Sequence, residues 1–523
     1  MKIRIRLIIT TLLACQFMLA ETHIQVDDPL TWKAEALQPY IGQEVIFDVP
    51  MVICSNDGGY TISTRRLFSP TNQVLPKFQD TQAYNTIVSL NAAGRLNLNG
   101  VSGYHRCGEK IYNLRAYVSS INTLVFKTGE WRGNTQKDLL NMNVHKELGV
   151  EGCDSCLVVC AYNLEWYDIT KTTKQQKINA ALTLIDADIL GLIEIEGQEA
   201  TRKKVAELLN GTLTHRNYKA IIESKGLGES QTVVFLYDSK RVKPYGEIQY
   251  IDRRVANRKK MICFEHLATG ERFIYSLNHF KAKTGGGTGG NADMHDGQGG
   301  WNADRKEEAQ AVMDEYKTFS RLVKDKDILL MGDLNAYGKE DPITVLKNNG
   351  MNDLHRWFHA DSSYSYQYGG LAGYLDHALC SNTMMPQVTG IMALHCNSDE
   401  IRNRSASDNT MFCGSDHDPV AVGLRLDSTK TYDPSPEVNT YDVMTGQSGD
   451  IVIRNAANNN RAFYAIYTVS GLLVRQQDLN GEYVDKKEIL SMEEHVTLPA
   501  ASGMYILYIY ANGQVYQRRF IIR

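Results

Sequence analysis

The sequence has no large excess of either charge. It holds 56 Lys and Arg residues against 60 Asp and Glu residues, which leaves a formal net charge of −4 at pH 7. Proteins that bind nucleic acid through a broad basic surface are strongly positive, so this balance excludes that class. A polyanionic substrate would have to be met by a local basic patch or by a metal ion.

Long hydrophobic runs and repeats are also lacking beyond residue 20. No later stretch is apolar and long enough to span a bilayer, and no heptad or longer period recurs. We therefore expect no stable membrane insertion of the mature chain. With 523 residues, 43% of them hydrophobic, the chain can form about two to four domains with ordinary cores.

The N-terminal end is typical of a targeting segment. Three basic residues precede the apolar run LIITTLLACQFMLA, after which the sequence turns polar. We expect a signal peptide over residues 1–20, cleaved after Ala20, and hence a secreted protein or one at the outer cell surface. The alternative is a lipoprotein anchored at Cys15, because LLAC can also be read as a lipoprotein signal.

Cysteine is sparse, and export would permit disulfides. Nine of the ten cysteines follow Cys15, and this odd number leaves at least one outside intrachain bridges. Cys153 and Cys156 have C-x-x-C spacing, but no second pair with zinc-ribbon spacing follows. A local disulfide or two ordinary thiols is therefore favoured over redox or zinc chemistry. The sequence leaves two further pairings open: Cys54 with Cys107, and Cys396 with Cys413.

Three patterned segments and a linker follow the signal peptide. Residues 21–150 hold short β-like runs separated by Gly, Asn and Pro, which predicts a small β-barrel or sandwich. Residues 151–427 alternate apolar strands with helical stretches such as DRKEEAQAVMDEYKTFSRLV, which predicts a layered α/β sandwich. Residues 428–442 contain two prolines and few apolar residues, as expected of a linker. Residues 443–523 return to short strands and predict an immunoglobulin-like β-sandwich.

Polar residues gather at strand ends in the middle segment. They are Asn163, Glu194, His279, Asp333, Asn335, Asp376, Asp416 and His417. Each one alone could simply meet solvent or cap a turn. Together they indicate more, because a carboxylate or imidazole is costly to bury unless it is paired or bound to a metal. Carboxylate and amide oxygens suit Mg²⁺, Mn²⁺ or Ca²⁺, and histidines suit proton transfer, so the set predicts metal-assisted hydrolysis of a phosphate ester.

Six motifs in order carry a resemblance to a known family: AYNLEWYD, DILGLIEIEG, LNHFKAK, GDLNAY, LDHALCS and GSDHDPV. Over roughly residues 157–426 the chain resembles the endonuclease/exonuclease/phosphatase superfamily, which includes deoxyribonuclease I and exonuclease III. It is most similar to the secreted nuclease-like members of Bacteroidota. The resemblance implies a four-layered α/β sandwich with the active site at one edge of two packed sheets. It also implies Mg²⁺, or else Mn²⁺ or Ca²⁺, as the cofactor.

The resemblance assigns metal ligands residue by residue. It implies that Asn163 and Glu194 hold the divalent metal, with Asp416 near it. Ile193 stands where the family usually has Gln. This departure affects a hydrogen bond behind the ligand and leaves the ligand itself in place.

The resemblance also assigns catalytic roles. Asp333 and Asn335 would contact the scissile phosphate and align the attacking water. His417 would act as the general base, oriented by Asp376. His279 matches the second histidine of the deoxyribonuclease I branch, where it assists the leaving group or stabilises the transition state.

Other candidates surround the glycine-rich stretch KTGGGTGGNADMHDGQGG, which follows His279. Lys281 and Lys283 could contact substrate phosphates, and Glu229 could be the carboxylate partner of His279. The stretch lacks the Gly-Lys-Ser/Thr ending of a phosphate-binding loop and the stacked nonapeptides of a calcium repeat. We interpret it as a mobile loop beside the site, in which three aspartates could bind an additional cation: Asp293, Asp296 and Asp304.

Both flanking segments carry resemblances of their own. The C-terminal LPASGMYILYIYANGQVYQRRFIIR is similar to the sorting domain of the type IX secretion system, which implies that machinery as a partner; the alternative is a plain accessory β-sandwich. The N-terminal segment resembles the β domain that precedes the nuclease in related proteins and could be OB-like. Such a barrel can offer aromatic rings to single-stranded nucleic acid. The candidate rings, unless they are core residues, are Tyr60, Phe68, Tyr84 and Tyr104.

These observations predict a secreted, metal-dependent phosphodiesterase that hydrolyses nucleic acid, DNA first and RNA second, with water activated by His417. Within the enzyme class, the alternative is a phosphomonoesterase or a lipid or inositol phosphate phosphodiesterase of the same superfamily. A lipid enzyme should carry an exposed apolar hairpin, which the sequence lacks. The alternative of another class is a surface binding protein with an inactive site, and the intact set of polar residues argues against it.

Overall fold

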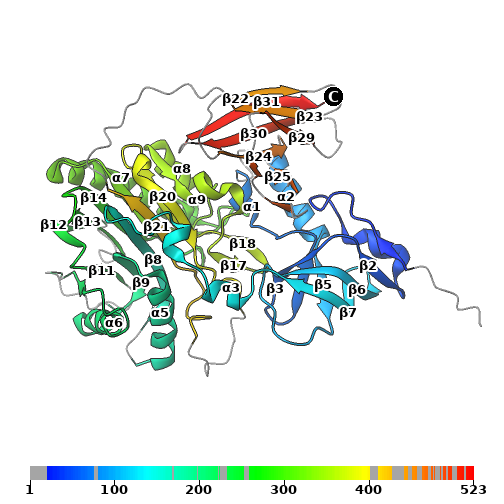
Figure 1. Cartoon of the computed structure of the whole chain (residues 1–523), viewed down its shortest axis with the longest axis horizontal. Coiled ribbons are helices and arrows are strands. Elements are labelled where there is room, and N and C mark those ends of the chain that lie inside the picture. The colour runs from blue at the N-terminus through cyan, green and yellow to red at the C-terminus, as the bar shows by residue number, and fades with distance from the viewer. Residues whose placement is uncertain are drawn as a thin grey trace, which may run out of the picture.

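The computed structural model describes residues 21–75, 81–167, 170–196, 198–221, 223, 232–251, 258–400 and 410–426, together with the strands between Tyr441 and Ile522. The predicted signal peptide with Cys15, the predicted linker up to residue 440, and Glu229 lie outside these residues. No helix among the described residues is long and apolar enough to cross a membrane. Figure 1 shows how the elements are arranged along the chain.

Two six-stranded sheets form the middle of the molecule. The first has the order β10-β11-β9-β8-β21-β20, and the second has the order β12-β13-β14-β15-β19-β16. The strands of the first sheet are β8 (Cys156–Tyr167), β9 (Ile189–Ile195), β10 (Tyr218–Ala220), β11 (Thr232–Asp238), β20 (Val388–Ala393) and β21 (Val420–Arg425). The strands of the second sheet are β12 (Val242–Tyr250), β13 (Lys259–His266), β14 (Arg272–His279), β15 (Ile328–Asp333), β16 (Met351–Asp353) and β19 (Asp376–Ser381).

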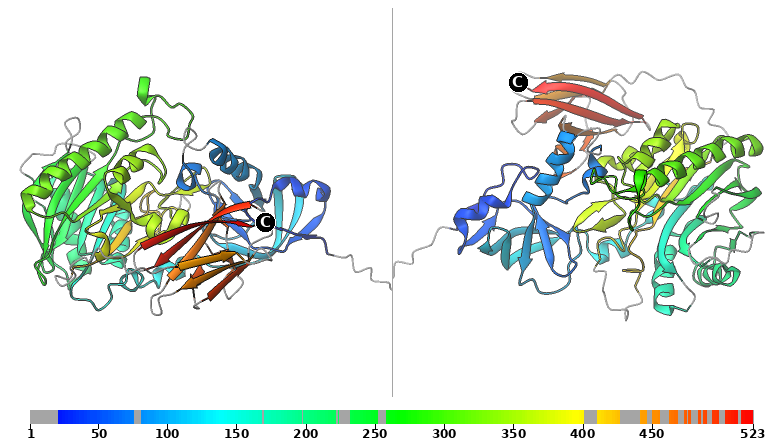
Figure 2. Two further views of the ribbon diagram at one scale, coloured as in Figure 1. Left: turned by 90° about the horizontal axis from the view of Figure 1, so that it is seen from above. Right: turned by 180° about the vertical axis from the view of Figure 1, so that it is seen from behind.

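The two sheets pack face to face through a shared apolar core. Val159 and Ile193 of the first sheet lie in one buried cluster with Tyr275 and Leu329 of the second. The inner strands read as nearly continuous apolar runs because both of their faces are covered. Helices lie on the outer faces of the pair, as Figure 2 shows from above. The predicted mixed α/β class with several sheets is therefore confirmed for this segment.

The outer helices are amphipathic. They are α5 (Thr172–Ile185) and α6 (Glu199–Thr212) on the first sheet, and α7 (Asn302–Val323), α8 (Asp341–Asn348) and α9 (Leu354–His359) beside the second. In α5 the buried apolar residues are Ile178, Ala181, Leu182 and Ile185, a spacing that places them on one face of the helix. That face packs on the first sheet, and the polar face meets solvent.

The strand register brings the polar ends of distant strands into one row. β14 and β15 run parallel and pair His279 with Asp333, and the antiparallel β19 pairs Asp376 with the same Asp333. In the first sheet the parallel strands β8 and β9 place Asn163 beside the residue that precedes Glu194. Ligand sites of α/β sheets form outside the carboxyl ends of parallel strands, which is the edge where these residues lie.

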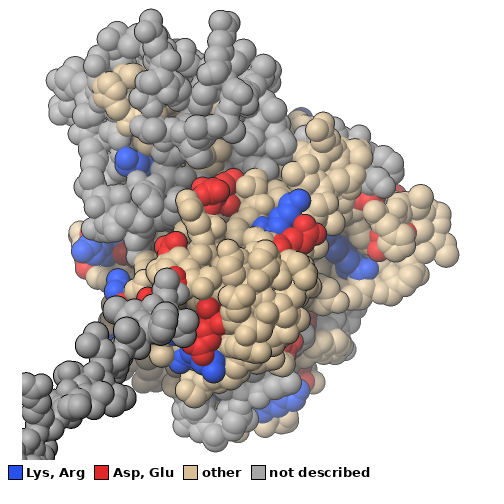
Figure 3. Space-filling model, turned by 90° about the vertical axis from the view of Figure 1, so that its right-hand side faces the viewer, with Lys and Arg blue, Asp and Glu red and all other residues tan. Residues whose placement is uncertain are grey.

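The N-terminal segment forms a separate seven-stranded sheet. Its strands are β1 (His23–Ile24), β2 (Glu44–Phe47), β3 (Met51–Ser55), β4 (Tyr60–Ser63), β5 (Leu96–Asn99), β6 (Lys110–Ser120) and β7 (Thr123–Arg132), and its helices are α1 (Pro70–Gln73) and α2 (Thr81–Ala93). β6 pairs with both β3 and β7, so β3, β4, β5, β7 and β6 close into a ring. The interior of this ring is filled by apolar side chains such as Ile53, Leu96 and Leu124. On the face shown in Figure 3, acidic and basic side chains of described residues lie close to one another.

The four aromatic candidates of this segment have local partners. Phe68 is buried and lies edge-on to Tyr364 of the middle segment. The Tyr60 hydroxyl donates to the Gly103 carbonyl, and the Tyr104 hydroxyl donates to the buried carboxylate of Glu400. Tyr84 is half-buried and packs against Val74, Ala83 and Ile87. All four side chains are thus engaged within the chain.

The C-terminal strands form two larger sheets and a short hairpin. The strands of the larger sheets are β22 (Tyr441–Thr445), β23 (Asp450–Asn455), β24 (Ala462–Thr468), β25 (Leu473–Val474), β28 (Lys487–Ile489), β29 (Glu493–Thr497), β30 (Gly503–Ala511) and β31 (Gln514–Ile522). One sheet has the order β22-β23-β29, and the other has the order β25-β24-β30-β31 with β28 beside β24. Ile453, Ile466 and Leu507 share a buried cluster between them.

The cysteines resolve into one disulfide and free thiols. Cys153 and Cys156 are bonded to each other, which bears out the local disulfide alternative for the C-x-x-C pair. The two pairings that the sequence leaves open are not formed, because all four of those residues are free thiols: Cys54, Cys107, Cys396 and Cys413.

Candidate active site

The structure brings the eight polar strand-end residues together at one edge of the two middle sheets. Asn163 Nδ2 lies 3.1 Å from Asp333 Oδ2 and 3.3 Å from Glu194 Oε1. His417 Nε2 lies 3.9 Å from the same Asp333 oxygen and 3.9 Å from Asp416 Oδ1. We call the set the Asp333 cluster, with the members Asn163, Glu194, His279, Asp333, Asn335, Asp376, Asp416 and His417.

The backbone is irregular at or next to two residues whose side-chain oxygens could bind a metal, Asn163 and Glu194. β8 loses register with β9 just after Asn163, where Glu165 and Trp166 have φ of 48° and 60°. Glu194 has φ of 57°, beside a register shift in β11. Non-glycine residues in this region cost about 1–3 kcal/mol each, and bulges re-aim side chains next to active sites. Ile193 accordingly packs into the core between the sheets while Glu194 joins the Asp333 cluster.

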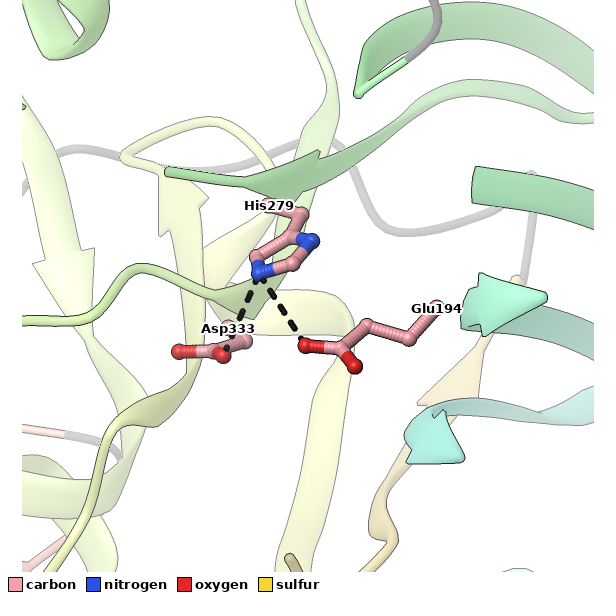
Figure 4. A group of neighbouring side chains, drawn as sticks. All are labelled: Glu194, His279 and Asp333. Atoms are coloured by element: carbon pink, nitrogen blue, oxygen red, sulfur yellow. Dashed lines mark ion pairs between the residues drawn. The ribbon is translucent and has the colours of Figure 1, made fainter. Parts of the chain in front are cut away.

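His279 lies between two carboxylates, as Figure 4 shows. Its Nε2 is 3.5 Å from Glu194 Oε1 and 3.7 Å from Asp333 Oδ2. Arg258 Nη2 approaches both ring nitrogens, at 2.7 Å from Nδ1 and 2.6 Å from Nε2. Burial, followed by the charge of Arg258, lowers the pKa of His279 well below the usual histidine value. The neutral imidazole is therefore the form that this site favours.

His417 and Asp376 form a hydrogen-bonded pair. His417 Nδ1 lies 2.8 Å from Asp376 Oδ2, which also accepts a hydrogen bond from Ser365 Oγ at 2.7 Å. A carboxylate only accepts, so Nδ1 carries a proton, and Nε2 faces Asp333 and Asp416. Burial alone would lower the pKa of His417, but Asp376 and Asp333 together raise it well above 6.5.

Two members of the Asp333 cluster are carboxylates with raised pKa values. Burial is the main cause for both, and it raises the pKa of Asp333 and of Glu194 above their usual values. Glu194, His279 and Asp333 each place one ligand atom within 4.8 Å of the others. Asn163 Oδ1 accepts one hydrogen bond, from Glu165 N, and keeps a second lone pair. Carboxylate and amide oxygens that share a buried space fit a hard divalent cation such as Mg²⁺.

Asn335 lies next to Asp333 and contacts it through both its backbone and its side chain. Its backbone N donates to Asp333 Oδ1 at 2.8 Å, and its side-chain nitrogen donates to Asp333 Oδ2 at 3.2 Å and to the Phe280 carbonyl at 3.1 Å. It adopts φ of 48° to make these contacts. The amide is therefore held against the central carboxylate, and its predicted contact with the scissile phosphate stays a prediction.

Arg258 is a site residue that sequence reasoning missed. It lies immediately before β13, and nothing in the run RKK distinguishes it from two neighbouring lysines. Those lysines pair with carboxylates elsewhere: Lys259 with Glu308 at 2.8 Å and Lys260 with Glu223 at 2.8 Å. Only the three-dimensional register of β13 beside β14 reveals that Arg258 reaches His279.

The two predicted phosphate-binding lysines point to other partners. Lys283 Nζ forms an ion pair of 2.6 Å with the fully buried Glu340. Lys281 Nζ lies 4.6 Å from the ring centre of Trp301. The charge of Lys283 is thus already neutralised, so its role toward substrate stays a prediction.

The glycine-rich stretch is tied down by Arg305 at the start of α7. This fully buried side chain donates to the carbonyls of Lys281, Gln298 and Gly300. The three aspartates of the region accept local hydrogen bonds: Asp293 from His295 N, Asp296 from Gln298 N, and Asp304 from Asn291 Nδ2. The stretch is a braced loop beside His279 in this structure, and an additional cation there stays a prediction.

The N-terminal segment braces the loop that carries His417. Asn397 Nδ2 donates to the His417 carbonyl at 2.6 Å. Two residues further along the same loop, the buried Asp399 forms an ion pair of 2.7 Å with Arg66 of the N-terminal segment. Leaving one member of a buried ion pair alone costs about 3–5 kcal/mol, so this contact fixes the two segments together. The position of His417 thus depends on residues outside the middle segment.

The pH dependence of the site follows from the His417 and Asp376 pair. A general base must be neutral, and the raised pKa of His417 means that its neutral form appears only as the pH rises above the usual histidine value of 6.5. We expect kcat/KM to rise with pH through that raised pKa. Asp376→Asn removes a charge that favours the imidazolium. It should therefore move the rising part of the pH profile to lower pH and reduce the maximal kcat/KM. A pH profile of both proteins tests this, and an unmoved limb would contradict the pairing.

Comparison with known protein families finds a match for the middle of the chain. Residues 160–417 match the family model described as Endonuclease/Exonuclease/phosphatase family. This stretch of the chain is similar to that family, whose members are hydrolases of phosphate esters and typically use divalent metals. No curated protein matches the sequence.

Solved structures of other proteins align with about half of the chain. An endonuclease/exonuclease/phosphatase family protein from Bacteroides thetaiotaomicron is 17% identical, with a TM-score of 0.38 over 51% of this chain and 97% of that one. The mannosyl-6-phosphatase of Bacteroides thetaiotaomicron VPI-5482 is 17% identical, with a TM-score of 0.39 over 51% and 98%. The human nocturnin catalytic domain is 13% identical, with a TM-score of 0.36 over 51% and 94%.

Proposed function

We propose that this protein is a divalent-metal-dependent phosphodiesterase that hydrolyses nucleic acid, with DNA as the first substrate and RNA as the second. The observation that carries the proposal is the orientation of His417. Its Nδ1 is held by Asp376, and its Nε2 faces Asp333 and Asp416 beside the oxygen donors Asn163 and Glu194. A base, a set of metal ligands and donors to phosphate therefore share one small site.

A divalent cation would be held by Asn163 and Glu194, with Asp416 near it. When bound, it would supply positive charge to a phosphate oxygen and help neutralise the charge that develops during hydrolysis. The protein's own part is to keep these oxygens close together and largely out of water. Glu194 achieves this through its strained backbone, and Asn163 through its two hydrogen bonds to carboxylates.

His417 would take a proton from the attacking water at Nε2. Asp376 keeps the proton on Nδ1, so the other ring nitrogen is free to accept. The same carboxylate stabilises the imidazolium that forms. Asp333 and Asn335 are placed to orient the water and the phosphate, because Asn335 and Asp333 are hydrogen-bonded to each other next to His417.

The leaving-group side of the site would be formed by His279 and Arg258. Arg258 supplies a guanidinium that can donate two hydrogen bonds to a phosphate. His279 is neutral for the reasons given above, so it would donate or accept a hydrogen bond at the departing oxygen. The two groups already contact one another, which places both at the same end of the Asp333 cluster.

We also propose that the protein acts outside the cytoplasm. The disulfide between Cys153 and Cys156 supports this, because disulfides persist in oxidising compartments. The basic and apolar N-terminal run is consistent with export, and the C-terminal strands with recognition by the type IX secretion machinery. The closed N-terminal ring agrees with an OB-like barrel.

A substrate panel tests the proposed function. The purified chain is incubated with plasmid DNA, single-stranded RNA and a phosphomonoester, each with Mg²⁺ or Ca²⁺. We expect cleavage of nucleic acid and little release of phosphate from the monoester, because two esterified oxygens flank the phosphorus in the preferred substrate. Hydrolysis of the monoester alone would assign the site to a phosphatase instead. No cleavage of either nucleic acid with any metal would contradict the proposal.

A further inference from the structure

A short hairpin forms part of the rim beside His417. It consists of β17 (Tyr366–Tyr368) and β18 (Leu371–Gly373), joined by Gly369 and Gly370 with φ of 58° and 75°. Positive φ at both central positions is the requirement of a tight two-residue hairpin turn, which glycine meets at no steric cost. The hairpin lies in the chain just before β19, which begins with Asp376.

Ser365, the residue before the hairpin, is hydrogen-bonded to Asp376 and to Asp418. Ser365 donates from Oγ to Asp376 Oδ2 at 2.7 Å, and its carbonyl accepts from Asp418 N at 2.8 Å. Asp418 directly follows His417 in the chain. The hairpin therefore has a defined position relative to the imidazole.

One face of β17 is directed toward the site. The Tyr366 ring lies 4.7 Å from the His417 ring, with an angle of 32° between the two planes. Alternate residues of a strand share a face, so Tyr368 lies on the same side as Tyr366, about 7 Å further along the strand. Tyr368 is 71% exposed, the highest value among the large apolar side chains of the described residues together with Leu322.

The opposite face of β17 is fixed to the N-terminal segment. Gln367 accepts a hydrogen bond from Arg66 Nη2 at 2.8 Å. On β18, Ala372 exchanges two backbone hydrogen bonds of 2.8 Å with Leu67 and Ser69. The hairpin is thus backed by a second domain, which would hold an exposed ring steady instead of leaving it on a free loop tip.

An exposed aromatic ring in this position can bind a nucleobase by stacking. A phosphodiester bound at the Asp333 cluster carries a nucleoside on each side, and a base that is not paired can lay its face on an aromatic side chain. A tyrosine on a backed strand does so with little loss of conformational freedom. We propose that Tyr368, next to Tyr366, is a stacking platform for an unpaired nucleobase adjacent to the scissile phosphate.

This inference rests on the proposed function and makes it more specific. It assigns single-stranded nucleic acid as the preferred form of the substrate, because a paired base in a duplex hides its face in the stack. It also gives the N-terminal segment a task in substrate recognition, since Arg66, Leu67 and Ser69 support the hairpin from behind.

The test compares Tyr368→Ala, Tyr368→Phe and Tyr117→Ala on a single-stranded DNA oligonucleotide that contains 2-aminopurine. Tyr117 is a matched control because it is 37% exposed on β6 of the N-terminal sheet. We expect Tyr368→Ala to raise KM by about 5- to 100-fold, to change kcat by less than about twofold, and to weaken the quenching of 2-aminopurine that stacking causes. Tyr368→Phe keeps the ring and should behave like the wild type, as should Tyr117→Ala.

The outcomes separate this inference from the function on which it rests. If the wild type cleaves the oligonucleotide and Tyr368→Ala matches it in KM and quenching, the platform is wrong and the phosphodiesterase stands. If Tyr368→Phe loses as much as Tyr368→Ala, the ring is not what binds, and the platform is again wrong. If the wild type cleaves no nucleic acid, the proposed function itself fails and the platform with it.

Discussion

His417→Gln is expected to lower kcat for DNA hydrolysis by about 10²- to 10⁴-fold, the range that general base catalysis contributes. Gln fills a similar volume and can still form hydrogen bonds, but it cannot take a proton from water. KM should change little, because the proposed partner of His417 is the attacking water, and its contacts are to the carboxylates of Asp376 and Asp333. Steady-state kinetics on a defined oligonucleotide measure both parameters.

His295→Gln is the matched control for this change. His295 belongs to the glycine-rich stretch, and its side chain is 89% exposed. The same substitution there should leave kcat and KM at the wild-type values. If His417→Gln retained more than a tenth of the wild-type kcat, His417 would not be the base.

Glu194→Gln is expected to weaken the binding of Mg²⁺ or Mn²⁺ by at least about tenfold, because the affinity of an oxygen site depends on the charge of its ligands. The variant keeps the shape of the side chain and the hydrogen bond with Asn163. Calorimetric titration of the metal into the purified protein measures this without any substrate. Activity at saturating metal should recover in part.

Glu196→Gln is the matched control for the metal site. Glu196 lies two residues along the chain, and its carboxylate accepts a hydrogen bond of 3.0 Å from Thr201 at the start of α6. Its removal should leave the affinity for the cation unchanged. Equal losses in both variants would mean that general charge near the edge, and not a ligand at Glu194, governs cation binding.

The sequence predicted which polar residues gather at this edge of the sheets, because they contrast with the apolar strands that precede them. A carboxylate, amide or imidazole after a run such as ILLMG or FIYSL departs sharply from its neighbours. The resemblance implied an active site at one edge of two packed sheets, and parallel strands bring their carboxyl ends to one edge. His279, Asp333 and Asp376 do meet, in adjacent strands at one register level.

Residues that act through distant contacts could not be predicted in this way. Arg258 sits in a basic run that is typical of a solvated turn, and Lys283 has its partner Glu340 57 residues further along the chain. The ion pair between Arg66 and Asp399, which braces the loop of His417, joins residues that are 333 positions apart in the sequence. Such pairs leave no periodicity or spacing in the chain, and only the fold reveals them.

Aromatic side chains posed a related problem. Tyr60, Phe68 and Tyr104 were candidates because they are aromatic and lie in a β domain, yet each has a partner within the chain. Tyr368 was not singled out, although at 71% it is the most exposed aromatic side chain among the described residues. Exposure depends on which side of a strand is covered by another domain, and that cannot be read from residue type.

The most direct measurement is hydrolysis of a single DNA oligonucleotide by the purified wild-type protein, first in EDTA and then after Mg²⁺ is added in excess. A metal-assisted phosphodiesterase should leave the oligonucleotide intact in EDTA and cut it into shorter phosphate-bearing products once Mg²⁺ is present. Cleavage that continues unchanged in EDTA, or an oligonucleotide that stays intact with Mg²⁺, Mn²⁺ and Ca²⁺ alike, would contradict the assignment of the Asp333 cluster as a metal-assisted phosphodiesterase site.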